Sequence, residues 1–242
     1  TYAARVAFFF GALWSLKSNP ASVLQNPYYF LRRLGGNLYR LLGSDALGVN
    51  NALHPGQLQR STDNGTTWAN VGPTPIISAG RQWGIQDVDI AANGVLWAIA
   101  CVDGGTGDVA FPAPTVYKST NDGVTWTSVF TDATQDSAQW RRFLALCVHP
   151  NNSSIIATVG DQLSGGVRVC NTWVSVNGGS SFSRNTGGTI ATSTRRAVMM
   201  DNNRLVGIHE TNFWYSDNYG VSWTQAPYGF LALQHQLLRV NQ

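Results

Sequence analysis

Short runs of alternating apolar and polar residues recur along the chain, separated by clusters of Gly, Asn, Asp and Ser. Alternation with a period of two predicts half-buried strands, and the clusters predict the turns between them. Four pairs of strands joined by tight turns are expected. Their first and second strands are 28–34 and 37–42, 88–91 and 95–102, 143–148 and 155–159, and 198–200 and 205–209.

One eight-residue pattern, S-x-[D/N]-x-G-x-[T/S]-[W/F], occurs four times, and each copy follows an expected third strand at 58–60, 116–118, 172–174 or 213–215. The Asp or Asn side chain can bond nearby backbone N–H groups, the Gly can take a positive φ, and the aromatic ring can pack inward. Each copy is therefore predicted to be a hairpin turn. The defining residues are Ser61, Asp63, Gly65, Trp68, Ser119, Asn121, Gly123, Trp126, Ser175, Asn177, Gly179, Phe182, Ser216, Asn218, Gly220 and Trp223.

Composition also favours a turn-rich all-β chain. Only 12% of the 242 residues are charged, about half of the usual quarter. Glu210 is the sole glutamate, and Lys17 and Lys118 are the sole lysines. Because Lys and Glu usually cover exposed helix faces, long solvated helices and coiled coils are excluded.

The repeated pattern resembles the Asp-box, or BNR repeat, of sialidases, sortilin-type receptor domains, a photosystem assembly factor, some glucan hydrolases, and many bacterial and phage surface proteins. Here only Asp63 keeps the aspartate, because Asn121, Asn177 and Asn218 replace it. The resemblance implies a β-propeller of four-stranded antiparallel blades, with the box between the third and fourth strands of each blade. In those families the box is structural and identifies no activity.

A single domain of about five blades is expected over residues 1–242. Residues 230–233 look like the first strand at 143–146, and 6–10 and 12–16 look like second and third strands. The two chain ends would then complete one blade together and cover the last open edges. The alternative is part of a six- or seven-bladed propeller. Residues 6–16 also have the length of a signal-peptide core, but they are too short to span a membrane.

Arginine and tryptophan precede three of the expected first strands, at what looks like the same position in each blade. In propellers, ligands usually meet this face, opposite the boxes. Guanidinium groups suit carboxylate or phosphate, and the indole rings could stack on a sugar. The candidate anionic or glycan face consists of Arg81, Trp83, Trp140, Arg141, Arg142, Arg195, Arg196 and Glu210. Loops at 43–56, 103–115 and 160–166 are expected on the same face. The alternative, that the arginines bond carbonyl groups or pair with Asp87, Asp89 and Asp136, stays open.

Catalysis has weaker support, and no catalytic residue is assigned. The sialidase family combines an arginine triad, opened by an R-I-P-type motif, with a tyrosine nucleophile, a partner glutamate and an acid-base aspartate. The motif is absent, and Glu210 is the only possible glutamate. Other glycosidases need two carboxylates roughly 5 to 9.5 Å apart. Candidates for such a pair are Asp87, Asp89, Asp103, Asp108, Asp161 and Glu210.

No metal, cofactor or nucleic acid is expected. Cys101, Cys147 and Cys170 lack a CxxC spacing and are predicted to be small buried residues. The histidines lack an HExxH pattern, and no basic run exceeds two residues. The predicted function is a non-catalytic binding or structural module, as in a phage tail or appendage, that recognises a glycan or an assembly partner. A sialidase-like glycoside hydrolase and a protein-docking assembly factor are the alternatives. The expected location is extracellular, at a cell surface or on a virion.

Overall fold

The computed structural model describes residues 32–34, 36–42, 57–72, 76–78, 81–102, 113–133, 139–164, 167–186, 196–209 and 212–229, and at several strand ends it describes the backbone alone. All regular structure in these residues is β. Four antiparallel sheets form, each called a blade below. Blade 1 has β1 (Arg32–Leu34), β2 (Asn37–Leu42), β3 (Gln57–Ser61) and β4 (Ala69–Asn70). Blade 2 has β5 (Ile76–Ser78), β6 (Arg81–Ile90), β7 (Leu96–Val102), β8 (Thr115–Ser119) and β9 (Thr127–Thr131). Blade 3 has β10 (Gln139–Val148), β11 (Ile156–Ser164), β12 (Val167–Ser175) and β13 (Ser183–Asn185). Blade 4 has β14 (Arg196–Met199), β15 (Leu205–His209), β16 (Asn212–Ser216) and β17 (Thr224–Gly229).

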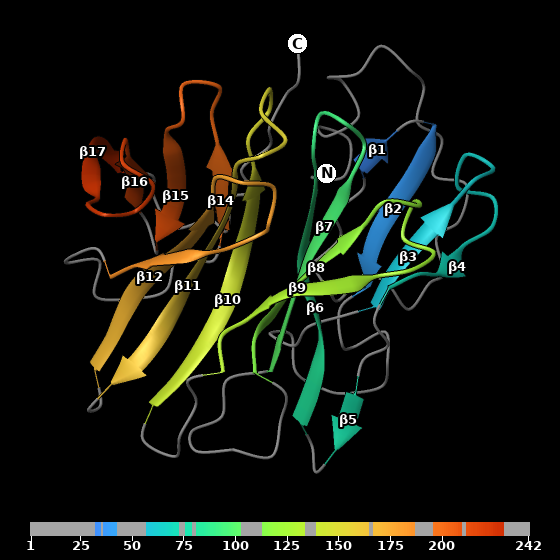
Figure 1. Cartoon of the computed structure of the whole chain (residues 1–242), viewed down its shortest axis with the longest axis horizontal. Helices are drawn as coiled ribbons and strands as arrows, with labels where there is room; N and C mark the ends of the chain where they lie inside the picture. Colours follow the sequence, from blue (N-terminus) through green and yellow to red (C-terminus); the bar gives the residue numbers. More distant parts are fainter. Residues whose placement is uncertain are drawn as a thin grey trace.

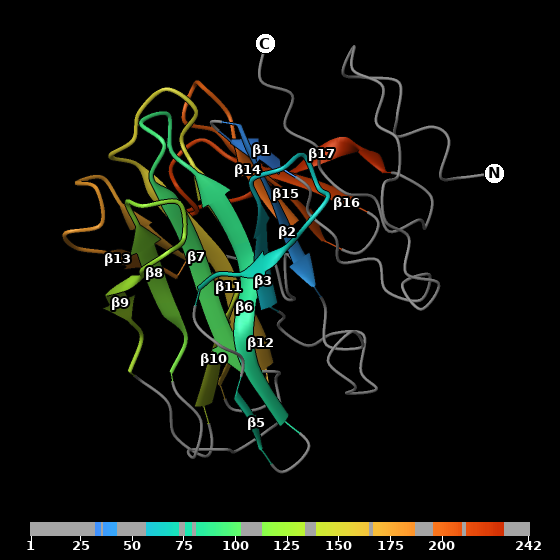
Figure 2. The ribbon, with the colours of Figure 1, turned by 90° about the vertical axis from the view of Figure 1, so that its right-hand side faces the viewer.

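Strands follow one another in sequence order within every blade, so each blade is a simple antiparallel meander. The long strand β10 lies against both β6 and β14, which makes these the inner strands of three neighbouring blades. Figure 1 shows blades 4, 3, 2 and 1 one after another from left to right, and Figure 2 shows the same sheets from the side. The predicted all-β, bladed architecture is confirmed. The expected strands at 6–10, 12–16 and 230–233 lie outside the described residues.

The repeated turns join the third and fourth strands of the blades, as predicted, and one serine hydroxyl organises each of them. In blade 1 the Ser61 hydroxyl donates to Asp63 Oδ1 at 2.7 Å and accepts the Gly65 N–H at 2.8 Å. The hydroxyls of Ser119, Ser175 and Ser216 make the same two bonds in the other blades. All four serines are almost fully buried.

The Asp or Asn side chain closes the second half of the turn. Asp63 Oδ1 accepts the Thr67 N–H at 2.8 Å, and Asp63 Oδ2 accepts the Thr67 hydroxyl at 2.6 Å. In blade 2, Asn121 accepts the Thr125 N–H through Oδ1 and donates to the Thr125 hydroxyl through Nδ2. The hydroxyl simply reverses its role, from donor to acceptor. This is why asparagine can replace aspartate without changing the turn.

The turn glycines have positive φ angles, and three of them also contact the preceding blade. Gly179 of blade 3 has φ +87°, and a Cβ atom there would lie 2.5 Å from a ring carbon of Trp97 in blade 2. A Cβ at Gly123 would press on Val71 of blade 1, and one at Gly220 would collide with Thr172 of blade 3. Glycine is therefore required by both backbone conformation and the blade interface.

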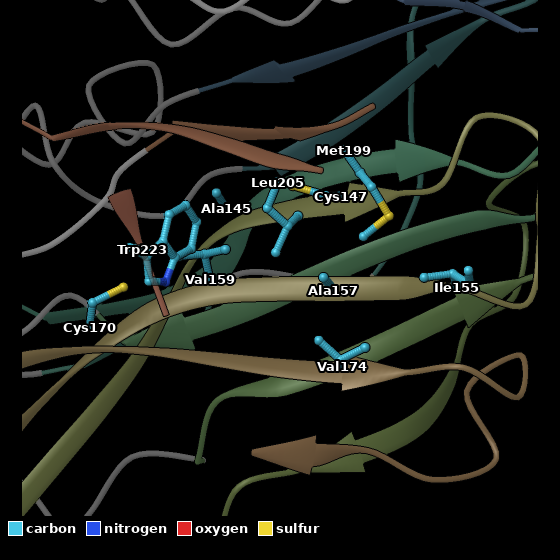
Figure 3. Close-up of a cluster of buried hydrophobic side chains, with 10 residues drawn as sticks. All are labelled: Ala145, Cys147, Ile155, Ala157, Val159, Cys170, Val174, Met199, Leu205 and Trp223. Atoms are coloured by element: carbon cyan, nitrogen blue, oxygen red, sulfur yellow. The ribbon is translucent and has the colours of Figure 1, made fainter. Parts of the chain in front are cut away.

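Apolar side chains fill the spaces between the blades. Between blades 3 and 4, Ala157, Val159 and Cys147 face Met199 and Leu205, and all five are buried (Figure 3). Cys170 belongs to the same cluster, so the prediction of small buried cysteines is confirmed for Cys147 and Cys170. Phe143, Trp173 and Trp97 lie in the cluster between blades 2 and 3.

Three local predictions differ from the structure. The residues 160–166, expected as a long loop, are mostly strand, because β11 runs to Ser164 and pairs residue by residue with β12, which begins at Val167. Strands β6 and β10 begin earlier than expected, so Arg81 and Arg142 lie within strands and do not precede them. Strand β5 was not predicted; its three residues pair with the early part of β6.

Adjacent glycines in the turn of blade 3 allow the two roles of glycine to be separated. Gly178 has φ +69° with open space around its Cα, whereas Gly179 has a similar φ and touches Trp97. We expect Gly178→Ala to lower the free energy of unfolding by about 1 kcal/mol, the backbone cost alone. Gly179→Ala should cost about 3 kcal/mol or more, since Trp97 must also move. Urea unfolding midpoints measure both, and equal losses would contradict the contact.

Candidate functional site

The predicted arginines and tryptophans lie at the starting ends of the inner strands. Arg81 and Trp83 begin β6, Trp140, Arg141 and Arg142 lie near the start of β10, and Arg196 begins β14. The structure describes the backbone of these residues. Arg195 and Glu210 lie outside the described residues. In blade 1, Arg33 of β1 pairs with Leu38, which pairs with Ser61, so Arg32 and Arg33 lie at the opposite end of their strand, beside the repeated turn.

Strand register allows positions in different blades to be compared. In blade 2, Leu96 at the start of β7 pairs with Ser119, the first residue of the repeated turn. In blade 3, Ile156 at the start of β11 pairs with Ser175 in the same way. Leu96 and Ile156 are therefore equivalent, and so are residues at equal distances along β7 and β11.

By this measure, Trp83 and Arg141 are equivalent. Trp83 pairs with Val102, the sixth residue after Leu96, and Arg141 pairs with Gln162, the sixth after Ile156. Both strands also carry a bulge just beyond this position. Two neighbouring inner strands thus carry a tryptophan and an arginine at equivalent backbone positions.

The arginines do not occupy equivalent positions in the different blades, although the sequence predicts that they do. Arg142 pairs with Asp161 of β11, whereas Arg196 pairs with Ile208, only three residues beyond Leu205, which is the equivalent of Ile156 in blade 4. Arg81 lies beyond Trp83 and pairs with Ser78 of β5. The arginines are therefore staggered along the inner strands. Their role in binding stays a prediction.

Asp87 and Asp89 join blades 2 and 3. Their side chains are 4% and 6% exposed. Asp87 Oδ2 accepts the N–H of Leu146 at 2.9 Å, and Asp89 Oδ2 accepts that of Val148 at 2.9 Å. Each carboxylate also accepts, through Oδ1, the N–H of the residue that follows it. Both acidic residues thus cover the open edge of β10, whose other edge pairs with β11. In the sequence, Asp87 and Asp89 are candidates for a catalytic pair or for partners of the arginines.

The next blade junction lacks this pair of carboxylates. By register, Ala145 and Cys147 of β10 are equivalent to Asp87 and Asp89, since they hold the same places relative to Ile156 and Leu96. Both are buried in the cluster shared with blade 4. The Asp pair is therefore specific to the junction of blades 2 and 3 among the junctions described.

Three further carboxylates, those of Asp132, Asp217 and Asp63, are also engaged. Buried Asp132, just after β9, accepts the indole N–H of Trp173 in blade 3 at 2.9 Å. Exposed Asp217 pairs with Arg204, whose guanidinium group lowers the pKa of that carboxyl. The hydrogen bonds from Thr67, followed by that from Ser61, lower the pKa of Asp63 to about 2. Asp103 and Asp108 lie outside the described residues.

His149 is a buried histidine whose ring contacts the backbone of two blades. Its Nδ1 accepts the N–H groups of Asn151 and Asn152 at 3.1 and 3.0 Å. The ring proton is therefore on Nε2, which lies 3.1 Å from the Asp201 carbonyl of blade 4. Among the described residues, no cluster of His, Cys, Asp or Glu could hold a metal ion. The same residues include no helix long and apolar enough to cross a membrane.

Four antiparallel meanders lie side by side, three of them in contact through their inner strands and blade 1 joined to blade 2 by an apolar cluster, and this arrangement is that of a β-propeller. The chain matches no family model, and no curated protein is similar in sequence. Among solved structures it resembles the GH74 enzyme of Niastella koreensis, with a TM-score of 0.51 and 17% identity over 78% of this chain and 28% of that one. It also resembles the Trypanosoma rangeli sialidase, with a TM-score of 0.53 and 11% identity over 82% of this chain and 36% of that one. The chain thus spans less than two thirds of either protein, and these similarities show the fold alone.

The Asp pair leads to a stability prediction. Asp87→Ala removes a buried carboxylate and leaves the Leu146 N–H without that acceptor. We expect it to lower the free energy of unfolding by about 2–4 kcal/mol. Asp217→Ala, which breaks an exposed ion pair, should have a much smaller effect. Chemical unfolding measures both, and an equal small effect would show that β10 does not depend on Asp87.

Asp63 should make the free energy of unfolding depend on pH between about 4 and 2. Because the pKa of Asp63 in the folded protein is about 2, below its ordinary value of 3.8, its contribution to stability is present above pH 4 and is lost as the pH falls through 2. Asp63→Asn, which copies the other three turns, should remove this loss. Urea midpoints in a pH series should therefore show the wild type falling more steeply than the variant between pH 4 and 2. Parallel curves would contradict the assignment.

Proposed function

We propose that this chain is a carbohydrate-binding β-propeller whose ligand meets the starting ends of β6 and β10. One observation carries the proposal: Trp83 and Arg141 occupy equivalent positions on these two neighbouring inner strands. An indole ring stacks on the apolar face of a sugar, and a guanidinium group binds a carboxylate in a bidentate way. Together they suit an acidic saccharide.

A binding role without catalysis is supported by the structural use of four described carboxylates. Asp63 closes a turn, Asp87 and Asp89 cover the edge of β10, and Asp132 holds Trp173. These acidic groups are fixed by N–H or O–H donors of the protein. A place in a virion, such as a phage tail, or on a cell surface is part of the proposal. It is supported by the resemblance of the turn pattern to Asp-box proteins of such surfaces.

Glycoside hydrolysis is the second candidate. It is supported by the register, which places the carboxylate residue Asp161 directly opposite Arg142, near the proposed binding end. It is also supported at the level of fold by the similarity to a sialidase and a GH74 enzyme. In this version Glu210 would assist a tyrosine nucleophile, as in the sialidase family.

Binding to an acidic oligosaccharide, first on a glycan array and then by calorimetry, tests the main proposal. Trp83→Ala and Arg141→Ala should each weaken binding about tenfold or more, the loss expected for a stacking or charged contact. Arg204→Ala is the matched control, because Arg204 pairs with Asp217 near the repeated turns. It should bind normally. Absence of saccharide binding, or equal loss in the control, would contradict the proposal.

A fluorogenic sialoside distinguishes the two candidates. The binding proposal expects no turnover by the wild type. Turnover that disappears in Glu210→Gln would instead establish the hydrolase and overturn the non-catalytic role.

A further inference from the structure

Three asparagines in the chain are followed directly by glycine, namely Asn64, Asn93 and Asn177. In such a pair the backbone nitrogen of the glycine can attack the side-chain carbonyl carbon of the asparagine, because glycine has no side chain to hinder the approach. All three asparagines are exposed and lie in tight turns. Sequence and exposure therefore do not distinguish them.

The carboxamide groups of Asn93 and Asn177 are held by hydrogen bonds. Asn93 Oδ1 accepts the Val95 N–H at 3.2 Å. Asn177 Oδ1 accepts the Ser181 N–H at 3.0 Å, and Asn177 Nδ2 donates to the Ser181 hydroxyl at 2.8 Å. Either side chain must give up these bonds before its carbonyl carbon can turn toward the next backbone nitrogen.

The carboxamide group of Asn64 has no such restraint, since no residue that the structure describes makes a hydrogen bond to it. Asn64 has φ 56°, in the left-handed region that asparagine tolerates better than most residues. Its contribution to the turn of blade 1 is therefore conformational. The neighbouring Asp63 makes the side-chain bonds that hold this turn together.

The turns also differ in their ties to the rest of the protein. The Asn93 N–H donates to Ser153 Oγ of blade 3 at 3.2 Å. The turn that contains Asn177 contacts the Trp97 ring of blade 2. In the turn of blade 1, the atoms nearest to Gly65 belong to the same blade. Because local opening costs least where a segment has the fewest contacts, the turn of blade 1 should open more readily than the other two.

From these differences we propose that Asn64 is a site of spontaneous deamidation through a cyclic imide. The Gly65 nitrogen forms a bond to Asn64 Cγ, and the bond from Cγ to Nδ2 breaks. Ammonia leaves with the Nδ2 atom and the proton of the Gly65 N–H. Water then opens the imide at either of its two carbonyl carbons. One opening gives aspartate at position 64, and the other gives isoaspartate, in which the main chain runs through Cβ and Cγ.

The Ser61 hydroxyl controls access to the reacting nitrogen. It accepts the Gly65 N–H at 2.8 Å and is itself held by Asp63 at 2.7 Å. The Gly65 N–H must leave Ser61 before its nitrogen can bond to the carboxamide carbon. Opening of this one turn therefore sets the rate of deamidation at Asn64.

The two products should affect the turn differently. Blade 2 has Asp122 at the position equivalent to Asn64, with φ 57°. Aspartate is therefore compatible with the turn. Isoaspartate lengthens the main chain between Ser61 and Gly65, so the Ser61 hydroxyl can no longer bond both Asp63 and the Gly65 N–H. The isoaspartyl product should loosen blade 1.

Peptide mapping of the whole chain, kept folded in mildly alkaline buffer, tests the proposal. Mass spectrometry detects the conversion of each amide to an acid, and labelling by an isoaspartyl methyltransferase identifies the isoaspartyl product. Asn64 should react at least about tenfold faster than Asn93 or Asn177. In concentrated urea all three should react at similar rates, because the turn bonds are then absent. Equal rates in the folded chain, or a slower reaction at Asn64, would overturn the proposal.

Two variants test the role of the turn. Ser61→Ala removes the acceptor of the Gly65 N–H and should speed the reaction at Asn64, whereas Asn93, which monitors general unfolding, should react as before. An unchanged rate at Asn64 would overturn control by Ser61.

Asn64→Gly copies the glycine that blade 3 has at this position, and it should abolish the reaction without changing the fold. During incubation the urea midpoint of the wild type should fall as isoaspartate accumulates, while that of Asn64→Gly stays constant. A wild-type midpoint that does not change as isoaspartate forms would contradict the effect on blade 1.

Discussion

One buried serine hydroxyl in each blade holds the turn on which the remaining contacts depend. It donates to the Asp or Asn two residues later and accepts the N–H of the glycine four residues later. The hydroxyl thereby fixes the glycine in its positive φ conformation. In blades 2, 3 and 4 the glycine in turn lies against the preceding blade, most closely at Gly179 and Gly220. Local hydrogen bonding and blade packing are thus set by the same few atoms.

Much of the fold could be predicted from the sequence because these contacts are local. The eight-residue turn pattern places the third and fourth strands, and the short turns such as 92–94 place the first two. The hairpin at 160–166 could not be predicted, since Gly160, Asp161 and Ser164 are typical of loops. These residues are strand because β10 pairs with β11 on one side and β12 does so on the other.

The candidate site was only partly predictable, for a physical reason. The positions of Trp83 and Arg141 depend on bulges in β6 and β10, and a bulge shifts every residue beyond it by one place. Counting residues in the sequence cannot include such shifts. Likewise, the bond from Leu146 to Asp87 joins residues 59 apart in sequence. Such a contact leaves no local pattern, so two residues that look free for chemistry serve the backbone of the next blade.

The turn glycine contacts the preceding blade, and this one-way contact is relevant to how a chain of repeated blades can evolve. In blades 2, 3 and 4 the turn glycine contacts the blade before it, so these described interfaces are head-to-tail. A head-to-tail interface has no built-in end: any copy of the unit offers one donor surface and one acceptor surface. Gene duplication could lengthen this array by a blade without inventing a new interface. In propellers that close into a ring, the angle between neighbouring blades limits their number.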